Sequence, residues 1–308
     1  VTIKGTGIYS GTVSKNFEIK EALYTVYGYQ VAIKGNFDLK YYIDLSKEAA
    51  NDTDAYIEFK VGDRIQKVKQ RETSNGHYVY TCEVPVAQIG DKVTATLHYK
   101  DKSYALTQYS VKDYLNTIVQ NKDKKEEYGK AADIASAILN YGARAQIYFG
   151  YKTDSLVNSA LPDAEIKKVD SILAQDIKNA ITNKESGNLE NNDFKYYGAS
   201  LVCKSDTGMK LYFENKNSLS LKEIDKKYDI SVKDCKKQIS KSINGNMICI
   251  TINDLNATEL DDNFVVQITN KQNSSQSMSV STSPYIYIKK SMDSGNAKLI
   301  NLGKAMYW

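Results

Sequence analysis

The sequence of 308 residues predicts an α+β fold that is mainly β. We expect two tandem units, each a β-sandwich followed by a helical pair, after a short β tail. The main observation is a repeat, because Tyr27–Ile43 (YGYQVAIKGNFDLKYYI) aligns without a gap on Tyr197–Phe213 (YGASLVCKSDTGMKLYF). In addition, apolar residues first recur at every second position, as in strands, and later with the period of a helix.

These patterns divide the chain into four segments. Residues 1–20 form the β tail, and residues 21–152 form the first β-sandwich with its helical pair. Residues 153–192 form a partly helical connector. Residues 193–308 form the second β-sandwich with its helices, and we expect this copy to be truncated and the chain to be a piece of a longer protein.

The first unit has the strand density of a sandwich, with about seven strands separated by turn-forming pairs such as Gly62-Asp63 and Asn75-Gly76. The expected strands are Tyr24–Ile33, Phe37–Leu45, Ala55–Val61, Ile65–Lys69, Tyr78–Val84, Lys92–Tyr99 and Ser103–Gln108.

Two helices follow in the first unit. Ser110 is a side-chain cap for a helix that begins at Val111, and a second helix runs from about Tyr128 to Phe149. Gly142 interrupts the apolar face of the second helix and indicates close packing there, and Gly150 ends it.

The connector and the second copy show the same kinds of helix and strand signals. Pro162 stands near a helix start in the connector, and strands recur between residues 195 and 280. Thr282 or Ser283 caps the next helix, and a last helix starts near Ala297. The repeat places Ser110 opposite Ser281.

Composition argues against nucleic-acid binding and against membrane insertion. The formal net charge is only +4, with lysines and acidic residues interspersed, so no nucleic-acid-binding face is expected. No run of about 18 apolar residues occurs, so we expect no membrane insertion. The basic stretch Lys233–Lys241 is interpreted as a solvated face, with contact to an anionic partner as the alternative.

The four cysteines show no CxxC spacing, which argues against a zinc or thioredoxin-type motif. Cys203 and Cys249 lie at apolar strand positions, where a free cysteine behaves as a small apolar residue. Cys82 stands alone in the first copy. A single disulfide bridge that involves Cys235 remains open.

No catalytic, phosphate-binding or dinucleotide-binding motif is present, and we expect no enzyme activity and no cofactor. His77 and His98 have no histidine counterpart in the second copy and are interpreted as surface residues. Residues 51–54 and 261–262 lack the spacing of an EF-hand loop, so we expect solvated loops rather than a metal site. Acidic residues abound, but a single tryptophan at the chain end disfavours a glycosidase cleft.

Tyrosine is the outlier of the composition, with 24 residues against 7 phenylalanines and 1 tryptophan. Most of these tyrosines suit sheet packing, and exposed ones suit protein-binding surfaces because they offer large, rigid contact areas. The candidates for exposed binding residues come from divergent segments near loops: Tyr24, Tyr29, Tyr78, Tyr99 and Tyr104.

Several segments of the sequence resemble known bacterial surface proteins. The tail Val1–Ile19 resembles the closing strands of bacterial immunoglobulin-like repeats on cell surfaces. The strings YSVKDYLNTIV, ILNYGARAQIYFGYKTDSLVN and FKYYGASLVCKSDTGMKLYF resemble segments of large surface proteins of gut Firmicutes. Some immunoglobulin-binding, superantigen-like surface proteins of gut Lachnospiraceae are similar, and this resemblance implies a Gram-positive, secreted or wall-anchored modular protein.

The expected function is therefore that of a non-catalytic adhesin on the bacterial surface that engages a host protein, with immunoglobulin variable regions as the sharpest candidate. Two alternatives stay open. One is a module that binds carbohydrate or mucin through a row of exposed aromatic residues. The other is a structural spacer within a surface protein, which would be rod-like and would bind no ligand.

Overall fold

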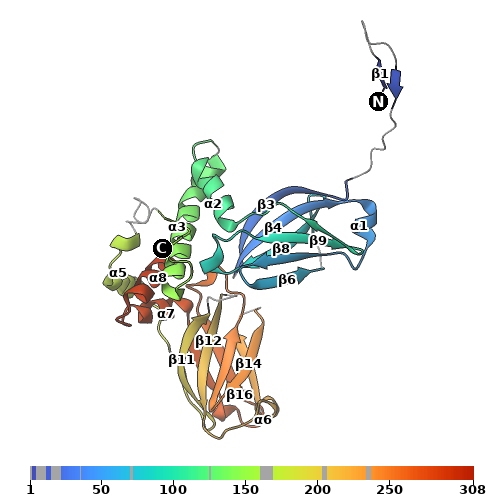
Figure 1. The fold of residues 1–308 in the computed structure, drawn as a ribbon. Helices are drawn as coiled ribbons and strands as arrows, with labels where there is room; N and C mark the ends of the chain where they lie inside the picture. Colours follow the sequence, from blue (N-terminus) through green and yellow to red (C-terminus); the bar gives the residue numbers. More distant parts are fainter. Residues whose placement is uncertain are drawn as a thin grey trace.

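The computed structural model describes residues 2–4, 12–14, 22–34, 36–69, 72–124, 126–159, 169–202, 207–233 and 237–308. It has the expected α+β fold, and within the described residues fifteen strands form four antiparallel sheets (Figure 1). The further strands β1 (Thr2–Lys4) and β2 (Thr12–Ser14) pair with each other in antiparallel fashion. Figure 1 draws this pair apart from the four sheets.

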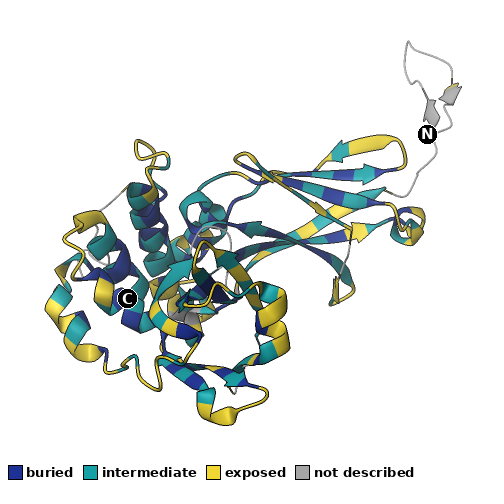
Figure 2. Ribbon diagram, turned by 90° about the horizontal axis from the view of Figure 1, so that it is seen from below, coloured by how far each residue is buried: buried dark blue, intermediate teal, exposed yellow. Residues whose placement is uncertain are grey.

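In the first half of the chain, residues 22–159, two four-stranded sheets enclose one core. Their strand orders are β3-β4-β8-β7 and β10-β9-β5-β6. The strands are β3 Tyr24–Lys34, β4 Asn36–Leu45, β5 Tyr56–Val61, β6 Arg64–Val68, β7 Glu72–Ser74, β8 His77–Val84, β9 Thr94–Tyr99 and β10 Lys102–Ala105. Buried positions alternate along these strands (Figure 2), and Leu39, Phe59 and Leu97 are fully buried between the sheets.

Tight turns set the strand pairing in this half. Asn75 and Gly76 have φ angles of 51° and 85°, and two consecutive positive values suit a two-residue hairpin turn. Gly62, with φ of 56°, turns β5 into β6. The strand pair expected across Gly62 is present, and the turn at Asn75-Gly76 joins β8 to the short strand β7, which the sequence did not predict.

Helices α1 (Lys47–Asn51), α2 (Val111–Gln120) and α3 (Glu126–Phe149) complete the first half, together with the 3-10 turn η1 (Val86–Gln88). The expected cap of α2 is confirmed, because the Ser110 hydroxyl accepts from the Asp113 backbone N–H and the Asp113 carboxylate accepts from the Ser110 N–H. Gly150 follows α3 with a φ of 66°, as expected of a helix end.

The connector docks on the helices of the second half. Its helix α5 (Ala174–Ala180) buries Ile177, which packs with Ile288 and Met292 in a small apolar cluster. The Lys289 ammonium donates to the Ile181 carbonyl over 2.9 Å. The expected helix start at Pro162 lies outside the described residues.

The second half, residues 169–308, also contains two sheets. Their orders are β11-β12-β15-β14 and β13-β16-β17. The strands are β11 Phe194–Val202, β12 Gly208–Asn215, β13 Tyr228–Lys233, β14 Ile239–Asn244, β15 Met247–Ile252, β16 Phe264–Asn270 and β17 Met278–Thr282. The helices are α6 Leu221–Lys227, α7 Pro284–Ser291 and α8 Ala297–Tyr307, and the 3-10 turns are η2 Ala257–Glu259 and η3 Ser274–Gln276.

The two halves place their elements in the same order. The first sheets correspond strand by strand, and the second sheets differ by β6, which has no counterpart. The expected helix start at Thr282 or Ser283 is confirmed, because Ser283 precedes α7 as Ser110 precedes α2, and the alignment of Ser110 on Ser281 is off by two residues. The same backbone bond follows each cap, from Lys112 to the Ile89 carbonyl and from Tyr285 to the Leu260 carbonyl.

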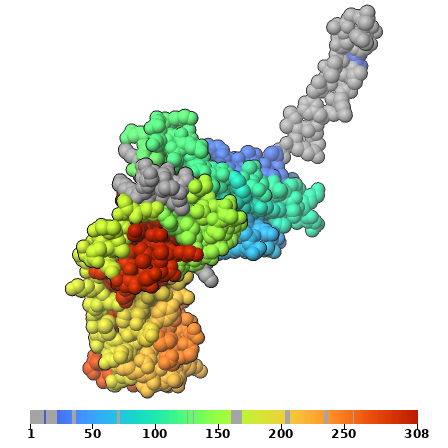
Figure 3. All heavy atoms as spheres, turned by 60° about the vertical axis from the view of Figure 1, so that its left-hand side comes forward, coloured from blue at the N-terminus to red at the C-terminus, as the bar shows by residue number. Residues whose placement is uncertain are grey.

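Helices α3 and α8 join the halves. Leu302 of α8 is buried in the core cluster of the first half, and Figure 3 shows the carboxy-terminal helices (red) between the green helical segment and the yellow strands. The strands of the two sandwiches run in different directions in Figure 1, so the molecule is bent at these helices. Among the described residues, no helix has the length and apolar character needed to cross a membrane.

Candidate binding surface

The five tyrosines expected at the surface lie largely against the core of the first half. Tyr99 is 7% exposed, so its expected exposure is wrong. The other four, Tyr24, Tyr29, Tyr78 and Tyr104, are half-buried and pack on the same core. The Tyr24 hydroxyl donates to the Ala105 carbonyl over 2.8 Å, and the Tyr29 ring stacks on Tyr109 with 4.0 Å between ring centroids.

The alternation of the strands explains this burial. Tyr29 pairs with the buried Tyr41, and Tyr78 pairs with the buried Ile43, so both belong to the inward-facing set of their sheet. Tyr99 lies in the buried register of β9. Strict period-two counting along each strand would have assigned these three tyrosines to the inner face.

The exposed tyrosines are instead Tyr27 and Tyr197, with 69% and 80% of their surface accessible. Both lie in strands at the edge of a sheet, β3 and β11. In each strand the pairing register skips one residue, between Val26 and Gly28 and between Tyr196 and Gly198. The skipped residue is the tyrosine, and a β-bulge of this kind redirects a side chain out of the regular alternation.

Tyr27 does not extend freely into solvent. Its ring stacks on the His77 ring, with 3.9 Å between centroids and an angle of 19° between planes. His77 is held in turn by the Asp44 carboxylate, which lies 2.6 Å from its Nδ1 atom. The side chain of His77 is only 18% exposed, so it forms a floor beneath the Tyr27 ring rather than a separate surface residue as expected.

A second aromatic residue lies on the same face of the sheet. Tyr42 pairs with Gly28 in the register of β3 and β4, and its hydroxyl donates to the Gln30 side-chain oxygen over 2.5 Å. We call the group formed by Tyr27, Gln30, Tyr42, Asp44 and His77 the Tyr27 surface. It presents one ordered aromatic ring with polar groups around it, which suits recognition of a partner surface.

The second half reproduces this arrangement in part. Tyr212 pairs with Gly198, and its hydroxyl lies 3.0 Å from the Ser200 hydroxyl, as Tyr42 lies near Gln30. The floor differs, because Met247 begins β15 where His77 begins β8. The stacked tyrosine and histidine pair is therefore a feature of the first half.

The remaining candidates for chemistry have structural partners. His98 stacks on Tyr56 with 4.5 Å between centroids and lies 3.2 Å from the Ser103 hydroxyl. Burial raises the pKa of the Cys82 thiol to about 12, so it is not an activated nucleophile. Cys249 is buried and free, and the open question of a bridge at Cys235, like the position of Cys203, lies outside the described residues.

Charged groups give no metal site in the part of the chain that the structure describes, where no three histidine, cysteine, aspartate or glutamate side chains group together. In the basic stretch, Lys233 is exposed, and Lys237 and Lys241 pair with neighbouring acids. Lys237 forms an ion pair with Glu259 over 2.8 Å, and Lys241 pairs with Asp225.

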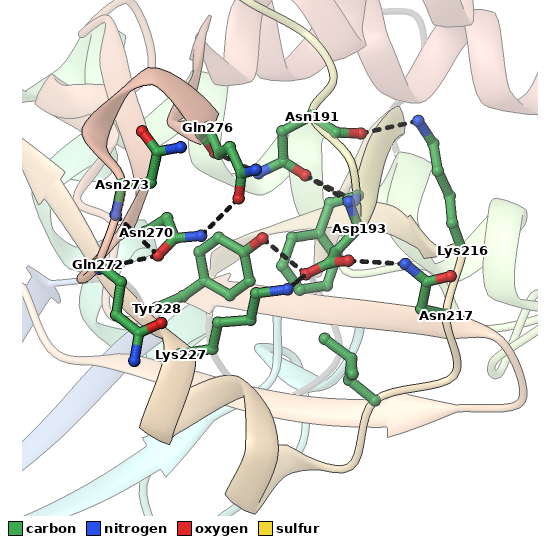
Figure 4. Close-up of polar contacts among 12 residues, drawn as sticks. Asn191, Asp193, Lys216, Asn217, Lys227, Tyr228, Asn270, Gln272, Asn273 and Gln276 are labelled. Carbon is green, nitrogen blue, oxygen red and sulfur yellow. Dashed lines mark hydrogen bonds and ion pairs between the residues drawn. The ribbon is translucent and has the colours of Figure 1, made fainter.

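A polar cluster surrounds the buried Asp193 in the second half (Figure 4). Asp193, which is 2% exposed, accepts from the Lys227 ammonium, the Tyr228 hydroxyl and the Asn217 amide over 2.5, 2.7 and 2.7 Å. Burial alone would raise the pKa of the Asp193 carboxyl, but these hydrogen bonds outweigh it and hold the pKa below its ordinary value. Because each of these donors has a hydrogen-bond acceptor in Asp193, the cluster holds the strand ends in place and does not offer a ligand site.

Comparison with known proteins gives no assignment, since no protein-family model matches the chain and no curated protein matches it significantly.

Proposed function

We propose that the chain is a non-catalytic binding protein of a bacterial surface, and that it engages a host protein through the Tyr27 surface. The observation that carries this proposal is the combination of exposure and order at Tyr27. The ring is 69% accessible, yet it is stacked on His77, which Asp44 holds in place.

This combination favours binding for a physical reason. An exposed aromatic ring gains contact area when a partner covers it, and fixing the ring in advance reduces the conformational entropy lost on association. Tyrosine also keeps a hydroxyl for hydrogen bonding at the rim of the contact. The resemblance to immunoglobulin-binding surface proteins makes immunoglobulin variable regions the partner proposed, and an extracellular or wall-associated location goes with it.

The proposal includes two tandem units, with binding concentrated in the first. The common strand order and the shared bulge at Tyr27 and Tyr197 support one ancestral unit. The stacking of Tyr27 on His77 supports a specialised first copy, because Met247 occupies the position of His77 in the second copy. The antiparallel pair β1 and β2 agrees with the origin proposed for the tail in an upstream immunoglobulin-like repeat.

The two alternatives find less support. Among the described residues, the exposed aromatic side chains Tyr27, Phe149, Tyr197 and Trp308 come from β3, α3, β11 and the residue after α8, so they do not form the row along one sheet that glycan binding favours. A spacer is best served by a straight rod, whereas the sandwiches meet at a bend (Figure 1).

Capture from human serum and intestinal secretions tests the proposal. The full chain and its Tyr27→Ala variant are immobilised side by side, and bound proteins are identified by mass spectrometry. We expect immunoglobulin heavy and light chains on the wild type and their depletion on the variant. Ile65→Ala serves as a matched control, because Ile65 is also exposed, at 56%, but lies in β6 of the other sheet.

Equal capture of immunoglobulin by Tyr27→Ala would place the binding site elsewhere and overturn the role of the Tyr27 surface. Absence of immunoglobulin from the wild type would overturn the partner. A glycan array on the same immobilised chain then separates the remaining alternatives, since a spacer retains nothing on it.

A further inference from the structure

A cavity of about 310 Å³ lies where the two halves meet, away from the Tyr27 surface. Its walls come from the end of α3, the outer face of β11 and β12, and helices α7 and α8. A volume of this size falls at the lower end of the range for small-molecule sites, about 300 to 1,000 Å³. The described residues therefore leave room for a small ligand in a partly open cavity.

The two walls of the cavity differ in chemistry. The helical wall is mainly apolar and includes Phe149, Ile288, Leu299, Leu302 and Met306. The sheet wall carries a compact polar group formed by three neighbouring side chains. An apolar cavity with a few convergent polar groups is the usual form of a site that orients an amphipathic molecule.

The polar group consists of Lys210, Ser200 and Tyr212. Ser200 and Lys210 are direct partners in the pairing of β11 with β12, and the Ser200 and Tyr212 hydroxyls lie 3.0 Å apart. None of the ion pairs between described residues includes Lys210. A lysine ammonium beside an apolar wall is stabilised by an anion, and the hydroxyl that accepts within the Ser200–Tyr212 hydrogen bond keeps its own proton to donate to the same anion.

We propose that this cavity binds a small amphipathic monocarboxylate, with the carboxylate on Lys210, Ser200 and Tyr212 and the aromatic or aliphatic body against α7 and α8. This site goes beyond the proposed protein binding and uses none of the same residues. The first half supplies a matched comparison, because Lys40 occupies the corresponding place in β4 but is not among the residues that line this cavity.

Isothermal titration calorimetry with the full chain tests the site. The probes are 3-phenylpropionate, indole-3-acetate and octanoate, each paired with its neutral amide. We expect at least one carboxylate to bind with a stoichiometry of one and its amide to bind at least tenfold more weakly. This comparison uses the unaltered chain, so it does not depend on the folding of any variant.

Variants then locate the ligand. Lys210→Gln should weaken binding of the carboxylate at least tenfold, and Leu299→Trp should abolish binding by filling the cavity, whereas Lys40→Gln and Tyr27→Ala should leave it unchanged. Circular dichroism checks that each variant is folded. The proposal is overturned if none of the three carboxylates binds, if carboxylate and amide bind equally, or if Lys40→Gln matches Lys210→Gln. Loss of protein binding in Tyr27→Ala would not affect this result, so the two proposals fail separately.

Discussion

Tyr27 and Tyr197 occupy the same place in two corresponding edge strands, each as the extra residue of a β-bulge next to a glycine. They are the two tyrosines with more than half of their surface exposed among the described residues, at 69% and 80%. Bulges re-aim side chains and are common at sheet edges and functional sites. The repetition of the bulge preserves the exposed ring while the residue at the position of His77 changes.

Replacing Tyr27 should leave the fold intact. The side chain lies on the surface, and surface substitutions usually change the free energy of unfolding by no more than about 0.5 kcal/mol. The matched internal change is Tyr41→Ala, because Tyr41 is fully buried and such truncations cost about 3–5 kcal/mol. Urea denaturation followed by circular dichroism compares the two, and a cost for Tyr27→Ala near that of Tyr41→Ala would show that Tyr27 supports the sandwich instead.

Gly142→Ala should destabilise the first half although alanine favours helices. A Cβ atom on Gly142 would lie 2.4 Å from Cδ1 of Ile89 and 3.0 Å from Cγ1 of Val157, which confirms the close packing expected at this glycine. Overpacking of this kind costs about 1–3 kcal/mol, against a helix-propensity gain of about 1 kcal/mol. The midpoint of thermal unfolding should therefore fall.

A second variant removes the Ile89 side chain that the new Cβ atom would meet. In an Ile89→Ala background the cost of Gly142→Ala should shrink or reverse, since the nearest clashing atoms are gone. Additive effects of the two changes would contradict the packing explanation.

Asp193→Ala should be among the more damaging single changes in the second half. It removes the acceptor shared by Lys227, Tyr228 and Asn217, and of these donors the Tyr228 hydroxyl belongs to a buried residue, for which a lost partner costs about 1–3 kcal/mol. Glu214→Ala is a suitable control in β12, because Glu214 is only half-buried. Chemical denaturation should separate the two variants by more than about 2 kcal/mol, and equal stability would contradict the role given to the cluster in Figure 4.

Stability should fall on acidification below about pH 4, near the ordinary pKa of aspartate. At Asp193 and Asp113, burial acts to raise the carboxyl pKa, but the hydrogen bonds from their partners lower it below its ordinary value. A depressed folded pKa means that the stabilisation is complete above the unfolded value and is lost as pH falls through the folded value. Urea midpoints between pH 6 and pH 3 measure the slope, and Asp113→Asn should flatten it. An unchanged slope in that variant would contradict the assignment for Asp113.

Local sequence signals predicted much of the fold. The Ser110 cap, the turn at Asn75-Gly76 and the end of α3 at Gly150 depend on short-range geometry, and each is present. The three-residue strand β7 is too short to show a period, so its pairing with β8 depends on tertiary contacts. The start of α7 after Ser283 was also predicted, but the alignment of Ser110 on Ser281 is off by two residues because the loops before the two helices differ in length.

The candidate site was harder to predict. A bulge is a property of the pairing between two strands, and nothing local in β3 distinguishes Tyr27 from the alternating residues around it. Proximity to loops favoured Tyr99 and Tyr104, but one is buried and the other half-buried because the strand register governs their direction. The identity of Tyr27 and Tyr197 in the aligned segments was the available signal, since it marked a tyrosine shared by both segments.

Binding through Tyr27 is tested by the affinity of the full chain for purified human immunoglobulin Fab fragments, measured by biolayer interferometry for the wild type, Tyr27→Ala and Tyr197→Ala. We expect Tyr27→Ala to weaken binding about tenfold or more, the size of a hot-spot loss, and Tyr197→Ala to have a smaller effect. Equal affinity for the wild type and Tyr27→Ala, with both proteins folded, would show that the ordered Tyr27 ring does not carry the binding.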